Sequence, residues 1–171
     1  REGMCVRCEE TDIRPMGRAA AGVTGIRPEA SDYVVGLTAV DHTAQLLVVR
    51  ENGLGKRTPF VEYRLTNRGA KGVTTMNVTD KTGKVVSAMA VHDSDQLMLM
   101  TTKGQSVRIR VAQIRETGRN AQGVRLMNLN AGELIQDVAK VMADQEGNTS
   151  SELPPPADLP PSDPAAPGEG A

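Results

Sequence analysis

Nine arginines recur at three positions of this sequence, and their type and spacing could do chemistry. Each position returns after 50 and then 51 residues, which gives three series: Arg7, Arg57 and Arg108; Arg14, Arg64 and Arg115; Arg18, Arg68 and Arg119. A guanidinium group presents a planar fork of N–H donors that matches the oxygens of a phosphate. If the repeated units lie around a curve, each series places cations at regular intervals, as a bent polyanion requires. The series therefore predict a phosphate-binding rim.

Each series also has a structural alternative that the sequence leaves open. Asp12 and Glu62 lie two residues before Arg14 and Arg64 and could pair with them, and the Arg7 series lies on a strand with alternating polarity. The Arg18 series lies in glycine-rich turns, and the turn at 67–73 adds Lys71, so Arg68 and Lys71 are expected to make the strongest contact. A curved basic rim is what a DNA duplex needs in order to be bent around a protein. The predicted DNA-binding residues are Arg18, Arg68, Lys71, Arg119, Arg14, Arg64, Arg115, Arg57 and Arg108.

No set of residues typical of catalysis or metal binding accompanies these arginines. Cys5 and Cys8 form one C-x-x-C, but residues three apart on a strand point to opposite faces, and a structural zinc needs four ligands. His42 and His92 are expected in surface turns, and no base or metal site accompanies Tyr33 or Tyr63 in the sequence. We therefore predict no catalytic residue, no metal and no cofactor in this chain.

The elements that position the arginines are predicted to be short strands in three repeats. The segment GRAAAGV at 17–23 returns as NRGAKGV at 67–73 and GRNAQGV at 118–124. The runs 46–50 and 97–101 end in glycine turns and are followed by alternating segments such as 106–111, a pattern typical of β-hairpins. About four strands in about 50 residues predict an all-β, propeller-like fold with four-stranded blades.

The predicted blades cover about 1–40, 41–91 and 92–142, followed by a tail at 143–171. The first repeat has no counterpart of residues 45–49, so we expect further blades before it. Residues 1–143 hold 20 Lys and Arg against 15 Asp and Glu (20 − 15 = +5), whereas residues 144–171 hold six acids and no base (−6). The basic body predicts a polyanionic partner. The proline-rich tail predicts disordered, extended chain.

Several of these motifs resemble the C-terminal domain of the DNA gyrase A subunit, in the type IIA topoisomerase family. The similar segments are GLGKRTPF at 53–60, Tyr63-Arg64, RGAKGV at 68–73, TKGQSVRI at 102–109 and RNAQGVR at 119–125. The resemblance covers about residues 1–142, and the acidic tail is also similar. The family's gyrase box, QRRGGKG, has no full copy here, and residues 68–72 resemble a degenerate version in which Ala70 replaces a glycine.

The resemblance implies a β-pinwheel, a propeller whose neighbouring blades exchange strands, and it implies that duplex DNA wraps around the rim during supercoiling. It implies two partners besides DNA, the rest of the gyrase A subunit as a homodimer and the gyrase B subunit. It also implies no membrane and a bacterial cytoplasmic location on the chromosome. ATP and Mg²⁺ are implied only for other domains, as is the catalytic tyrosine. The homologous domain of the topoisomerase IV A subunit remains an alternative, and a protein-binding propeller is a remoter one.

Overall fold

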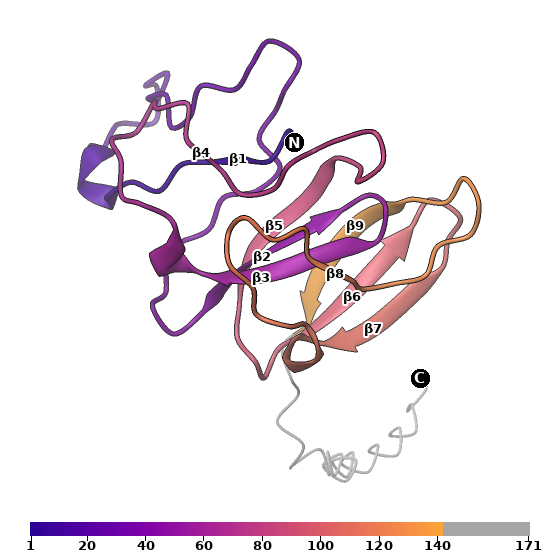
Figure 1. Cartoon of the computed structure of the whole chain (residues 1–171). Coiled ribbons are helices and arrows are strands. Elements are labelled where there is room, and N and C mark those ends of the chain that lie inside the picture. The colour runs from indigo at the N-terminus through magenta and orange to yellow at the C-terminus, as the bar shows by residue number, and fades with distance from the viewer. Residues whose placement is uncertain (142–171) are drawn as a thin grey trace, which may run out of the picture.

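The computed structural model describes residues 1–141, which form strands and three single-turn 3₁₀ helices (Figure 1). Within this range there is no α-helix, and therefore none long and apolar enough to cross a membrane. The predicted all-β class is confirmed, while the tail lies outside the described residues. The elements are β1 (Met4–Cys5), η1 (Glu10–Asp12), β2 (Gln45–Arg50), β3 (Leu54–Pro59), η2 (Phe60–Glu62), β4 (Val73–Thr74), β5 (Val85–Val91), β6 (Gln96–Thr101), β7 (Ser106–Arg110), η3 (Val111–Gln113), β8 (Val124–Arg125) and β9 (Ile135–Val141).

The second and third repeats each build an antiparallel sheet with the same arrangement of strands. Strand β2 lies between β3 and β5, with Leu47 opposite both Arg57 and Met89. Strand β6 lies in the same way between β7 and β9, with Met98 opposite both Arg108 and Ala139. Both hairpins turn at a glycine with positive φ, Gly53 at +80° and Gly104 at +81°. Equivalent residues of the two repeats therefore occupy equivalent places in space.

Short strands cross from each repeat to the sheet of the repeat before it. Strand β4 pairs with β1, with Val73 opposite Cys5, and β8 pairs with β3, with Val124 opposite Gly55. The glycine before each crossing strand, Gly72 or Gly123, has φ near +90°. A Cβ atom at either position would lie 2.5 Å from a backbone carbonyl oxygen of the strand it meets. The strand exchange expected of a β-pinwheel is present, and it depends on glycine at these two positions.

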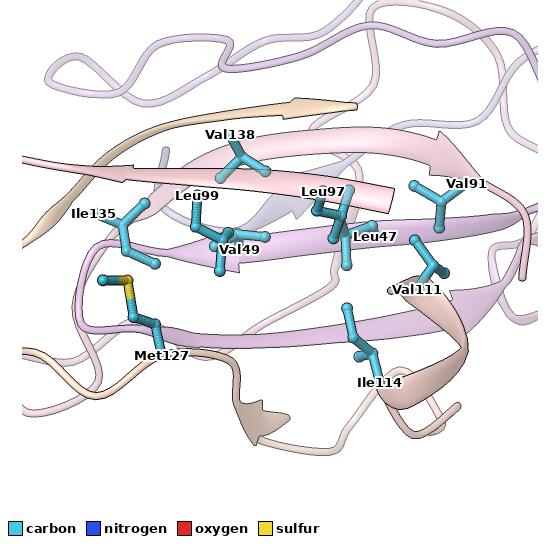
Figure 2. Packing of buried hydrophobic residues seen from close by; sticks show 10 residues of the cluster. All are labelled: Leu47, Val49, Val91, Leu97, Leu99, Val111, Ile114, Met127, Ile135 and Val138. Carbon is cyan, nitrogen blue, oxygen red and sulfur yellow. The ribbon is translucent and has the colours of Figure 1, made fainter. Parts of the chain in front are cut away.

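The hydrophobic core lies between the blades, because both faces of β2 are buried. Leu47 and Val49 face the third repeat and join a cluster that includes Leu97 and Leu99 and whose buried members are drawn in Figure 2. Leu46 and Val48 point to the opposite face and pack in a second cluster, which also includes Phe60, Tyr63 and Met76. The blades are therefore held together mainly by interleaved aliphatic side chains.

The first repeat differs from the other two in its last segment. Residues 34–40 occupy the sequence position of β5 and β9, yet no strand of residues 1–141 pairs with them. Leu37 is 95% exposed and Val34 58% exposed, whereas Val35 still packs against the second cluster. This is the repeat in which the sequence offers no counterpart of residues 45–49.

Candidate nucleic-acid interface

Arg14, Arg64 and Arg115 occupy the same place in the three repeats, two residues after the end of a 3₁₀ helix. The residue before Arg64 is Tyr63 and the residue before Arg115 is Ile114, and both are buried. Each of these anchors also closes its 3₁₀ helix, because its backbone N–H donates to the helix's first carbonyl, at 3.1 Å for Tyr63 and 2.9 Å for Ile114. An inward anchor turns the next side chain outward, so Arg64 and Arg115 face solvent; Ile13, the residue before Arg14, is itself 45% exposed, and Arg14 is exposed without such an anchor.

The three arginines of this series are all exposed and make no hydrogen bond or ion pair within residues 1–141. The alternative in which Asp12 and Glu62 pair with Arg14 and Arg64 has no support in the geometry, since neither pair lies within bonding distance. Their guanidinium groups are therefore available to an external anion, one from each blade.

The turn series, Arg18, Arg68 and Arg119, is divided between solvent and neighbouring backbone. The Nε–H of Arg68 donates to the carbonyl of Asp12 at 2.8 Å, and one terminal nitrogen lies 3.4 Å from the carbonyl of Thr24. Arg119 donates to the carbonyl of Thr74 at 2.9 Å, and Thr74 is the repeat equivalent of Thr24. Arg68 and Arg119 thus fasten their turns to the repeat before, although Arg68 remains exposed. Arg18 is exposed and makes no hydrogen bond or ion pair within residues 1–141.

Lys71, expected to strengthen the phosphate contact of Arg68, already has an acidic partner. Its ammonium lies 2.7 Å from Glu29, and both side chains are largely exposed. The hydrogen bond and the charge of Glu29 raise the pKa of Lys71. Exposed pairs of this kind are weak and are screened by salt, so a phosphate can compete with Glu29 for the lysine.

Arg57 holds two blades together, and its position removes it from the candidate phosphate contacts. The side chain is 8% exposed; it donates to the carbonyl of Ile114 and to Gln45 Oε1, and it pairs with Asp93. Arg7 makes the corresponding contacts one repeat earlier, with the carbonyls of Phe60 and Tyr63 at 3.0 and 3.2 Å. The structural alternative for this series is therefore the better interpretation of Arg57.

Arg108, the third member of that series, is exposed on β7 and donates to Gln96 Oε1. Within residues 1–141 no further repeat lies beyond β7 to supply the carbonyls that Arg7 and Arg57 bind. Its assignment as a DNA contact stays a prediction.

Lys56 is a buried basic residue that the sequence interpretation missed. Its Nζ donates to three backbone carbonyls in the turn of the next repeat, those of Gly118, Arg119 and Ala121. The distance is 3.2 Å to the Gly118 oxygen and 3.0 Å to the Ala121 oxygen. Burial lowers the pKa of Lys56 to about 8, and the charges of Arg50 and Arg119 contribute to the fall. The available signal was a break in the repeat, because the equivalent positions hold Val6 and Val107.

The cysteines and histidines form no site in the described part of the chain. Cys5 and Cys8 are free thiols, and burial raises the pKa of Cys5. His92 lies 3.1 Å from Asp41 and 3.7 Å from Asp95, an arrangement that links two surface turns. No group of three or more potential metal ligands is found among residues 1–141.

Together these features define a class: a strand-exchanged, propeller-like array whose blades each present an unpaired arginine. The sequence matches the family described as "DNA gyrase C-terminal domain, beta-propeller" in three segments, residues 1–41, 45–92 and 95–142. The chain belongs to this family.

Curated relatives agree with that assignment. The DNA gyrase A subunit of Staphylococcus epidermidis is 47% identical over 138 residues, and that of Staphylococcus aureus is 44% identical over 149. These alignments cover 80% and 86% of this chain but 16% and 17% of the relatives, so the chain spans about a sixth of their length.

Solved structures share the fold. A DNA gyrase A C-terminal domain superposes with a TM-score of 0.74 at 29% identity, covering 82% of this chain and 48% of that domain. The C-terminal domain of a DNA topoisomerase IV superposes with a TM-score of 0.77 at 24% identity, over 83% of this chain and 45% of the other. At this identity the similarity concerns the fold alone.

Proposed function

We propose that this chain binds the backbone of duplex DNA along its arginine-bearing edge and bends it, as part of a gyrase A subunit that supercoils DNA. The observation that carries the proposal is the series Arg14, Arg64 and Arg115, exposed and without a partner in the described residues. Three cations placed one per blade match a phosphate backbone that follows a curve. Arg18, Arg68 and Arg119 lie in the adjoining turns and would add further contacts.

The chemistry of this edge is electrostatic and sequence-independent. Arginine forks reach phosphate oxygens without reading base edges, so these contacts orient the duplex and carry no sequence information. Bending a site of 20 to 30 base pairs costs about 1–6 kcal/mol, so contacts must be distributed along the curve to offset it. A repeated fold supplies such a distribution, because each blade brings its own cation.

The remaining roles follow from the family and belong to the same proposal. Strand cleavage, ATP and Mg²⁺ would be supplied by other parts of the gyrase complex, namely the rest of a homodimer of A subunits and the gyrase B subunit. The site of action would be the bacterial chromosome in the cytoplasm. The contribution of this chain would be to hold and curve the DNA.

A salt-titrated binding assay on short duplexes tests the proposal, combined with a bending readout by energy transfer between end labels. The triple variant Arg14→Gln, Arg64→Gln, Arg115→Gln should lower the slope of log affinity against log salt by about 0.9 for each phosphate no longer neutralised. It should weaken binding to unrelated sequences equally and reduce bending.

The matched control removes exposed charge elsewhere, at Lys81 and Lys103 in turns outside the arginine series. The double variant Lys81→Gln, Lys103→Gln should change the slope far less. Effects in proportion to the charges removed, three against two, would mean that net charge alone governs binding. An effect confined to one DNA sequence would contradict backbone recognition.

A further inference from the structure

Lys56 is buried in β3 with no exposed surface, and its ammonium group faces the turn 118–121 of the following repeat. Three backbone carbonyls of that turn accept hydrogen bonds from it, those of Gly118, Arg119 and Ala121. An ammonium has three N–H donors and no acceptor, so its donors match these carbonyls in number. An apolar side chain of the same length could fill the space but could not bind the turn.

The turn that Lys56 holds is one of those that carry arginine. It closes through the N–H of Ala121, which donates to the carbonyl of Gly118 at 3.1 Å, and Arg119 extends from it to the carbonyl of Thr74. Arg115 lies three residues before the turn, and between them the N–H of Thr117 donates to the carbonyl of Arg57 at 3.0 Å. The backbone supporting these two arginines is thus fixed from β3.

We propose that Lys56 is a positioning residue for DNA binding, which holds the turn 118–121 in the conformation that presents Arg119 and does not itself touch DNA. This inference rests on the DNA-binding function proposed above. It applies to the junction between the second and third repeats, because Val6 and Val107 occupy the equivalent positions and have no amine.

The protonation state of Lys56 gives this role a signature. The charged groups that influence it are Arg50 from β2, Arg119 from the turn and Glu62 from η2; the arginines lower its pKa and Glu62 raises it. With burial, the pKa falls to about 8. After the proton leaves, two N–H donors remain for three carbonyls, and one carbonyl faces the nitrogen lone pair. The turn should therefore loosen as pH rises through about 8.

Two measurements on the chain test the proposal: hydrogen exchange of the Ala121 amide, and salt-titrated affinity for a short duplex. Lys56→Met should accelerate exchange at Ala121 and weaken DNA binding about threefold to tenfold, because the arginine is then presented by a looser turn. Lys56→Arg keeps a permanent charge and should retain much of the protection of the Ala121 amide and much of the affinity for DNA. Lys71→Met is the control, since it removes an exposed charge and should leave Ala121 exchange unchanged.

The second part of the test follows the wild-type chain as a function of pH. Between pH 7 and pH 9 its Ala121 exchange, corrected for the intrinsic rate, should accelerate and its DNA affinity should fall. Lys56→Arg and Lys56→Met should show no such pH-dependent change, because neither side chain titrates in that range.

The outcomes separate this inference from the proposed function. If the wild-type chain does not bind duplex DNA, the proposed function fails and the positioning role fails with it. If it binds, and Lys56→Met loosens the turn without loss of affinity, the positioning role is wrong while the proposed function stands. A loss of affinity in Lys56→Met without faster exchange at Ala121 would also overturn it.

Discussion

The two junctions between repeats are built on one plan but differ in how the turn is held. At the first junction, β4 pairs with β1 and Arg7 binds two carbonyls of the next repeat. At the second, β8 pairs with β3 and Arg57 makes the equivalent contact, to which Lys56 adds three bonds to the turn.

This difference shows how a repeat protein can vary function without altering its fold. The parts shared by both junctions, an exchanged strand and an interblade arginine, define the architecture. Within that architecture, one position holds Val6 at the first junction and Lys56 at the second. The buried ammonium of Lys56 fixes the turn 118–121, whereas the turn at 67–73 is held by Arg68 and by backbone contacts.

The largest effect is expected where the junctions are alike. Gly72→Ala and Gly123→Ala should each destabilise the chain by about 3 kcal/mol or more, because the new Cβ meets a backbone carbonyl at a strained φ. Gly22→Ala has the same φ class and nothing within 4 Å, so it isolates the conformational cost. Thermal unfolding followed by circular dichroism measures the stability of all three variants. If Gly22→Ala lost as much stability as the other two, the steric explanation would be excluded.

The next effect distinguishes the junctions through the pH dependence of stability. Lys56 releases its proton near pH 8 in the folded chain and near 10.5 when unfolded, so between these values the unfolded state binds more protons. The free energy of unfolding of the whole chain should therefore rise with pH across this window, by up to about 3 kcal/mol relative to Lys56→Met, because the cost of the buried charge is relieved. Local opening of the turn 118–121 becomes easier over the same range, because the ammonium's bonds to the turn are weakened. Denaturant titrations of both proteins at several pH values measure it, and parallel pH profiles would contradict the buried charge.

A smaller difference is expected between the two interblade arginines. Arg57→Ala should cost about 2–3 kcal/mol, since it leaves the carbonyl of Ile114 without a donor, and Arg7→Ala about 1–2 kcal/mol because its site is more open. Urea titrations compare them, with Arg108→Ala as the control on the exposed edge. If Arg57→Ala instead reduced only the salt slope of DNA binding, Arg57 would contact phosphate after all.

The smallest effect concerns the ion pair of the first junction. Glu29→Gln should release Lys71 and tighten DNA binding about twofold to threefold at low salt, and the gain should fade as salt screens the charges. Filter binding over a salt series measures this. Glu9→Gln, a change of equal charge at an exposed position that makes no ion pair in residues 1–141, is the control; an equal gain there would indicate a general charge effect.

The sequence determined the repeat, the strand-rich class and the family, because these follow from periodicity and local turn chemistry. Gly53 and Gly104 could be assigned to hairpin turns from the sequence, because the positive φ that such a turn requires is a local property that favours glycine. The spacing of 50 and 51 residues likewise aligned the arginines by periodicity alone, and it correctly placed Arg14, Arg64 and Arg115 at equivalent points.

Only the tertiary structure decided what each aligned arginine does. Arg57 and Arg64 look alike in the sequence, yet one is buried against Ile114 of the next blade and the other faces solvent. That distinction depends on which strand crosses to which sheet, a long-range pairing that local pattern does not encode. The same holds for Lys56, whose partners lie 62 to 65 residues away along the chain and reach it only because the blades exchange strands.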